Sequence, residues 1–332
     1  MTIFITNLKN DIWDIKTPKQ SFLSVIERKD QILENKLLIL KTIKKIKNAD
    51  KKFEQIINYE KISIKSLEDN NFFYNEVDIN SIDNYIITYN LYTTCEYLDL
   101  NMKLDISQPK IYILHLIESY KTLLYNLFDL YQLQICYFNL EPNNVVFSQN
   151  NLPLMINFQN SFFYNKIEQL KYFILKKQNF VYYPIEVHLL FYAYKNDICF
   201  NYDLMIQVID HFINQLTILR FFSQQYNDLF KKACIQYLSS FLNKDMNKII
   251  PLLISNVKTW DNYSLSIIYI QIVGELIEKY KIKETFLNDL FSLISKNIHP
   301  NPLKRESINY TFEHFDLLLG KHINWNFINT IN

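Results

Sequence analysis

The hydrophobic pattern of this chain changes its period near Pro109, and this change limits the folds that the chain can adopt. Before it, runs such as IFITNL, DIWDI and SFLSVIE alternate apolar and polar residues between polar or proline-containing turns, as in an antiparallel meander. Only Asp30 to Lys47 has helical spacing there. After Pro109, IYILHLIESYKTLLYNLFDLYQL has the pattern of a long amphipathic helix, and most of the chain beyond Tyr182 is helical in period. The sequence therefore predicts an α+β fold, strand-rich first and helical afterwards.

A short hairpin is expected where these two parts meet. The apolar runs VVF and LPLMI flank the polar linker SQNN. Asn139 stands before the first run, and Asn157 follows the second. Functional groups often lie where a loop leaves or enters a rigid strand, so both asparagines are candidate site residues.

Composition and charge bear on the size of the core and on the classes of partner to expect. With 332 residues, 49% apolar and 16% aromatic, the chain can bury a large core in one two-lobed domain or two small ones. The net charge of +1 gives no reason to expect a nucleic-acid or membrane partner. The basic run KTIKKIKNADKK, Lys41 to Lys52, places its lysines on the polar side of a helical pattern. We interpret it as a solvated face in preference to a binding patch.

Cysteine spacing and hydropathy suggest an intracellular protein without a metal. The four cysteines form no CxxC pair, and the six histidines add no ligand pair to them. The longest apolar run, Tyr263 to Gly274, is too short to span a bilayer and contains Gln271. The N-terminal MTIFITNLKND does not have the pattern of a signal peptide. We therefore expect reduced thiols and no membrane insertion.

Two motifs in the junction resemble those of protein kinases. YFNLEPNN occupies the place of the catalytic loop H-R-D-L-x-x-x-N, with Asn139 for the catalytic Asp and Asn144 at the metal-binding Asn. Eighteen residues past Asn139, NFQ stands where the family has D-F-G. Asn157 then replaces the metal-binding Asp, Phe158 matches, and Gln159 replaces Gly. The joint spacing is more specific than either motif alone.

Three later segments extend the resemblance. YYPIE looks like the A-P-E that closes the activation segment and ends at Glu186. TWDNYSLSIIYIQIVGEL is similar to the central C-lobe helix, with Asp261 in the place of the Asp that accepts hydrogen bonds from the catalytic-loop backbone. NIHPNPLKRES is similar to the segment whose Arg pairs with the A-P-E Glu, so the resemblance implies that Arg305 is the partner of Glu186. The likeness covers roughly residues 1–318.

The resemblance implies a bilobal protein-kinase-like fold. A reduced N-lobe, residues 1–100, would hold a small antiparallel sheet and one helix. An enlarged helical C-lobe, residues 101–332, would include a helical insert at about 190–258, because about 75 residues separate Glu186 from Asp261. The insert and the wording PIEVHLL resemble kinase-like proteins of large nucleocytoplasmic DNA viruses. This implies the host cytoplasm as the location if the chain is viral.

This sequence departs from the family pattern at the positions that take part in catalysis and in binding of metal and phosphate. The amide of Asn139 has negligible basicity. Magnesium prefers charged oxygen ligands, and Asn144 with Asn157 would offer only two neutral amides. Glu141 stands where serine/threonine kinases usually have a Lys facing the transferred phosphate. A glycine-rich loop is missing, since Gly274 and Gly320 are the only glycines in the chain.

The nucleotide-contacting Lys of the family has no clear equivalent. The third strand-like run offers only Arg28 or Lys29 near its end, with Glu34 as the candidate helix partner, and we favour a solvent-exposed role for all three.

Two classes of function remain. We favour a pseudokinase, a catalytically inactive binding or scaffolding protein with an unidentified protein partner and weak or absent ATP and Mg binding. The alternative is a divergent ATP-dependent serine/threonine kinase that recruits other carboxylates, such as Asp129 or Glu141.

Overall fold

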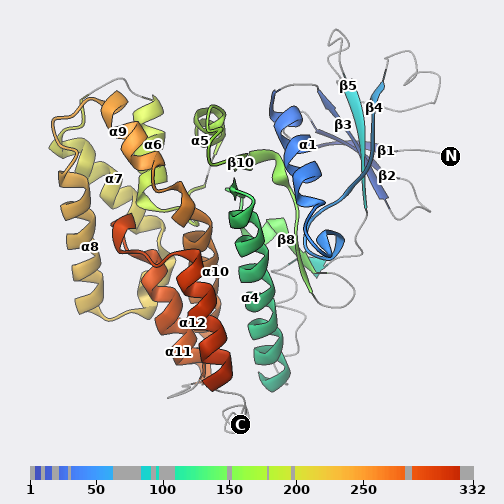
Figure 1. The fold of residues 1–332 in the computed structure, drawn as a ribbon. Coiled ribbons are helices and arrows are strands. Elements are labelled where there is room, and N and C mark those ends of the chain that lie inside the picture. The colour runs from blue at the N-terminus through green and yellow to red at the C-terminus, as the bar shows by residue number, and fades with distance from the viewer. Residues whose placement is uncertain are drawn as a thin grey trace. The chain divides into compact units, whose positions relative to one another are not determined.

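The structure is a computed structural model, and it divides the chain into two units. It describes residues 4–8, 12–16, 22–28, 31–62, 84–90, 95–96, 109–147, 152–177, 179–195, 199–280 and 286–321; for the strands before residue 31 and those in 84–96, and at 57, 60–62, 109–110 and 280, only the backbone is described. Unit 1 comprises Met1–Leu100 with Asn143–Ser161, and unit 2 comprises Asn101–Pro142 with Phe162–Asn332. The fold is α+β, as expected (Figure 1). The predicted lobe boundary near residue 100 stays a prediction, and residues 143–161 group with unit 1.

A five-stranded antiparallel sheet is the largest sheet in the described part of unit 1. Its strand order is β1-β2-β3-β5-β4. The strands are β1 (Phe4–Leu8), β2 (Ile12–Lys16), β3 (Phe22–Arg28), β4 (Ile56–Ile62) and β5 (Asn84–Asn90). The meander predicted from the first three alternating runs is therefore confirmed.

One helix and a small second sheet complete unit 1. The helix α1 (Gln31–Ile43) lies within the predicted helical segment and is followed by the 3-10 turn η1 (Ala49–Lys51). The second sheet has the order β6-β8-β9, with β6 (Cys95–Glu96), β8 (Val145–Phe147) and β9 (Pro153–Met155). Strands β8 and β9 pair antiparallel, as the apolar runs VVF and LPLMI predict.

The segment after α1 joins the hairpin through the backbone. Glu54 N–H donates to the Met155 carbonyl, and Met155 N–H donates to the Lys52 carbonyl, each at 2.9 Å. Phe53 and Met155 are fully buried at this bridge. The contact places the turn η3 (Phe158–Asn160), which follows β9, against α1.

The described part of unit 2 is mainly helical and includes the short antiparallel pair β7 (Ile135–Cys136) and β10 (Phe162–Phe163). Its described helices are α4 (Pro109–Gln132), α5 (Leu170–Lys176), α6 (Ile185–Lys195), α7 (Tyr202–Gln215), α8 (Gln224–Ser239), α9 (Met246–Ile254), α10 (Trp260–Tyr280), α11 (Phe286–Ser295) and α12 (Ile308–Lys321). Its short 3-10 turns are η4 (Thr217–Phe221), η5 (Val257–Thr259), η6 (Lys296–Ile298) and η7 (Pro302–Lys304). A further turn, η2 (Pro142–Asn144), begins in unit 2 and continues into the unit 1 segment that starts at Asn143.

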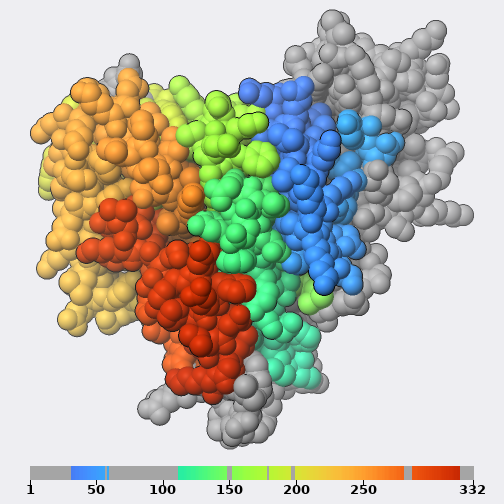
Figure 2. All heavy atoms as spheres, in the orientation of Figure 1, coloured from blue at the N-terminus to red at the C-terminus, as the bar shows by residue number. Residues whose placement is uncertain are grey.

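Helix α10 forms the centre of unit 2. It packs against α4 and α11, and α12 packs against both of these (Figure 1); α4 and α12 lie side by side at the surface in Figure 2. Every residue from Trp260 to Ile270 is buried, because α10 is apolar on all sides. No helix in the described ranges is long and apolar enough to cross a membrane.

The predicted helical insert consists of helices in the structure. Helices α6, α7, α8 and α9 pack on one another, and η4 packs against α10. Gly274 makes this second contact possible, because a Cβ at this position would lie 2.5 Å from the ring of Phe221. One of the two glycines thus serves close packing of helices.

Candidate functional site

The candidate catalytic loop starts in unit 2, in the residues after β7. Tyr137, Phe138, Asn139 and Leu140 are all buried there. Phe138 has φ 51°, a left-handed conformation that costs a bulky residue about 1 to 3 kcal/mol. The surrounding contacts must therefore hold it in place.

Asp261, at the start of α10, holds this backbone. Its Oδ2 accepts from Tyr137 N–H at 2.7 Å, and its Oδ1 accepts from Phe138 N–H at 2.9 Å. These are the loop contacts that the resemblance implies for Asp261. Burial raises the pKa of the Asp261 carboxyl to about 6, although both backbone hydrogen bonds lower it.

The side chain of Asn139 is engaged by a lysine from the segment after α5. Lys177 Nζ donates to Asn139 Oδ1 at 3.3 Å and also pairs with the Glu141 carboxylate. The Lys177 and Glu141 side chains are 14% and 22% exposed. The Glu141 carboxylate is therefore neutralised by a cation of the same unit.

Tyr183 contacts the same loop through its hydroxyl and its ring. Its hydroxyl donates to the Phe138 carbonyl at 3.1 Å or to Glu141 Oε1 at 3.2 Å. Burial first, and then Glu141, raise the pKa of the Tyr183 hydroxyl well above its ordinary value, so it remains a donor. The Tyr183 ring also packs on Phe138, with centroids 5.1 Å apart. The loop is thus fixed on three sides by Asp261, Lys177 and Tyr183.

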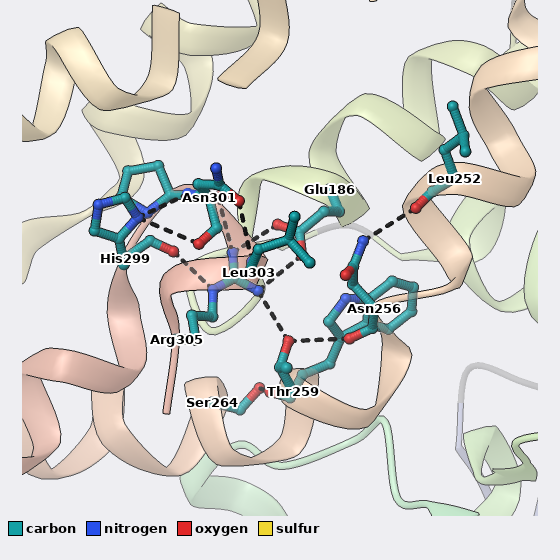
Figure 3. Close-up of polar contacts among 11 residues, drawn as sticks. Glu186, Leu252, Asn256, Thr259, Ser264, His299, Asn301, Leu303 and Arg305 are labelled. Atoms are coloured by element: carbon teal, nitrogen blue, oxygen red, sulfur yellow. Dashed lines mark hydrogen bonds and ion pairs between the residues drawn. The ribbon is translucent and has the colours of Figure 1, made fainter. Parts of the chain in front are cut away.

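Glu186 and Arg305 form the buried bidentate pair that the resemblance implies (Figure 3). Each oxygen of Glu186 accepts from one Nη of Arg305, at 2.7 Å in both cases. The remaining N–H groups donate to the carbonyls of His299 and Pro300 and to the hydroxyl of Thr259. The two charged side chains are 0% and 1% exposed. The contact ties the start of α6 to the loop before α12.

The candidate metal-binding amides lie in unit 1 and contact each other. Asn157 Nδ2 donates to Asn144 Oδ1 at 3.1 Å. Asn157 has φ 65°, a left-handed conformation that asparagine tolerates. The Ile156 N–H donates to the Asn144 carbonyl at 3.0 Å and fixes the backbone between them. An amide N–H therefore points at the oxygen that would have to bind a cation.

The turn after Asn157 is anchored to α1 and to the segment that follows it. Phe158 is fully buried, its N–H donates to Glu54 Oε1 at 2.9 Å, and its ring lies edge-on to Phe53. Asn35 of α1 donates to the Ser161 carbonyl at 2.7 Å. Gln159 is half-buried in η3. A buried carboxylate, Glu54, thus lies beside the NFQ motif, and no motif in the sequence marks it.

The sequence also singled out Arg28, Lys29, Glu34 and Asp129. Arg28 ends β3, but its side chain and all of Lys29 lie outside the described residues. Glu34 is exposed on the first turn of α1, and Asp129 is half-buried on α4. Among the described residues, no group of three or more His, Cys, Asp or Glu side chains is arranged to hold a metal ion.

Comparison with known proteins adds no relatives. No family model matches the chain, and no curated protein matches it. The functional argument therefore depends on the motifs and on the contacts described above.

Proposed function

We propose that this chain is a catalytically inactive protein-kinase-like protein, a pseudokinase, whose bilobal fold serves to bind another protein. The hydrogen bond from Asn157 to Asn144, 3.1 Å long, carries the proposal. It joins the two side chains that the resemblance assigns to the metal, and it uses one as a donor. A magnesium ion would have to break this contact and would gain only neutral ligands. Weak or absent Mg–ATP binding follows.

The contacts of Asn139 support the same proposal. A general base in phosphoryl transfer must accept a proton from the substrate hydroxyl, and an amide cannot do so. Asn139 is buried, and its Oδ1 accepts from Lys177. The side chain of Asn139 thus makes a structural contact.

The alternative, a divergent serine/threonine kinase, needs a carboxylate to replace those that are missing. Glu141 is a poor candidate, because its carboxylate already pairs with Lys177 and lies 3.2 Å from the Tyr183 hydroxyl. Recruiting it would break an ion pair that is largely shielded from water.

Thermal unfolding with ATP, with and without magnesium, tests the proposal. A ligand at about 100 times its Kd stabilises the native state by about 2.7 kcal/mol, which would raise Tm by several degrees. We expect no magnesium-dependent rise, either for the natural chain or for the double variant Asn139→Asp, Asn157→Asp. Phosphorylation of a general protein substrate that disappears in Asn144→Ala would contradict the proposal and support the alternative.

A further inference from the structure

A groove of about 400 Å³ lies within unit 1, between α1 and the start of β4. Leu37, Leu38 and Leu40 line it from the helix, and Ile56 and Tyr59 line it from the strand. Leu38 and Tyr59 are 42% and 55% exposed. Large apolar side chains on both walls of a concave surface are typical of a binding site, whereas single exposed apolar residues are common everywhere.

The rim of this groove is basic. Lys41 and Lys44 line it, and the run from Lys41 to Lys52 holds six lysines against one acidic residue, Asp50. Lys44 Nζ donates to the Ile56 carbonyl at 3.0 Å, so its cation is held between helix and strand. The dipole of α1 explains a lysine in its last turn, but Lys45 lies beyond the end of the helix at Ile43 and is also exposed. The basic run therefore borders an apolar groove.

The strand side of the groove favours an extended partner. In the sheet formed by the described strands, β4 is at one edge and has β5 as its only neighbour. Edge strands are where extended segments of other proteins pair with a sheet. The part of residues 31–59 that Figure 2 draws in blue belongs to the visible surface.

We propose that this groove binds a short acidic segment of a partner protein. One bulky apolar side chain of the segment would occupy the space between Leu38 and Tyr59, and flanking carboxylates would pair with Lys41 and Lys44, the two lysines that line the groove. The inference rests on the proposed binding function and names its surface and the chemistry of its partner. An anionic membrane would also attract the lysines, but a flat bilayer cannot fill a concave groove.

Selection of short random peptides displayed on phage, against the full chain, tests this directly. Enriched peptides should carry an aromatic or large aliphatic residue flanked by Asp or Glu. Their affinity, measured by fluorescence anisotropy with labelled synthetic copies, should fall about tenfold or more in Tyr59→Ser and in Lys41→Glu. These positions are exposed, so the variants should still fold.

Matched controls lie in unit 2. Leu303→Ser removes a leucine that is 84% exposed, and Lys232→Glu reverses an exposed lysine; each should change the affinity by less than about twofold. Peptides that bind all variants equally, a selection without acidic peptides, or a preference for phosphatidylserine vesicles would each overturn the inference. Detected phosphotransfer with groove-dependent peptide binding intact would refute only the proposed function.

Discussion

The Glu186–Arg305 pair of unit 2 and the Asn144–Asn157 pair of unit 1 show two different uses of polar groups. The first buries two full charges and matches every N–H of the guanidinium with an acceptor. The second joins two neutral amides through one hydrogen bond of 3.1 Å. Charge is thus present where it holds helices together and missing where the resemblance requires it for catalysis.

The largest effect should come from breaking the buried pair. Arg305→Ala and Glu186→Ala should each destabilise the protein by about 3 to 5 kcal/mol, because the other charge is left buried without a partner. The double variant should cost much less than the sum of the two. Urea unfolding followed by tryptophan fluorescence measures all three.

The exposed pair Arg220–Glu275 provides the control for this prediction. Its side chains are 56% and 53% exposed, so either alanine variant should cost less than about 1 kcal/mol. Additive effects at Glu186 and Arg305, or losses no larger than those of the control pair, would show that the buried pair contributes little to stability.

A second test uses the pH dependence of Asp261. Its pKa is about 6 in the folded chain and 3.8 without the fold, so the native state binds more protons between these values. Stability contributed by this group therefore falls as pH rises through this window, by about 3 kcal/mol in all and by roughly half of that above pH 5. Asp261→Asn lacks this titration.

The stability of Asp261→Asn relative to the natural chain should therefore rise between pH 5 and pH 7.5. Urea unfolding of both proteins over this range gives the difference at each pH. A constant difference would mean that the carboxyl of Asp261 keeps an ordinary pKa in the folded chain.

Most of the fold follows from local patterns in the sequence. The alternating runs before residue 30, the helical spacing from Asp30 to Lys47 and the amphipathic run after Pro109 each correspond to an element of the structure. The cause is that strands with one buried face and helices with one apolar side have different periods. The ends of α1 and α4 shift by only a few residues, which is where local signals are poorest.

The candidate site could be predicted only where a motif fixes the residue. The spacing of YFNLEPNN and NFQ pointed to Asn139, Asn144 and Asn157. Lys177 and Glu54 were missed, because each meets its partner through the tertiary fold. Lys177 lies 36 residues from Glu141, and Glu54 lies 104 residues from Phe158. No period or spacing marks such a contact in a single sequence.

A smaller effect is expected when the neutral pair is given a charge. Asn157→Asp removes the N–H that bonds Asn144 and places a carboxylate against an amide oxygen, which should cost about 1 kcal/mol. Asn243→Asp is the control, because Asn243 has nearly the same φ of 62° and is exposed. Urea unfolding with and without magnesium measures both. Recovery of the lost stability by magnesium in Asn157→Asp alone would reveal a metal site that needs only one carboxylate.

The smallest effect on stability is expected for the ion pair between Lys177 and Glu141. It is charged like the buried pair, but its side chains are 14% and 22% exposed, so water screens part of the interaction. A double-mutant cycle of Lys177→Met and Glu141→Gln should give a coupling energy of about 0.5 to 1 kcal/mol. The same cycle at Lys231 and Asp210, which are 52% and 51% exposed, should give a value near zero. A coupling as large as that of Glu186 and Arg305 would place this pair in the scaffold. A coupling energy equal to that of the exposed control would mean that Glu141 does not hold Lys177 in place. Asn139 would then accept a hydrogen bond from a lysine that is not fixed by an ion pair.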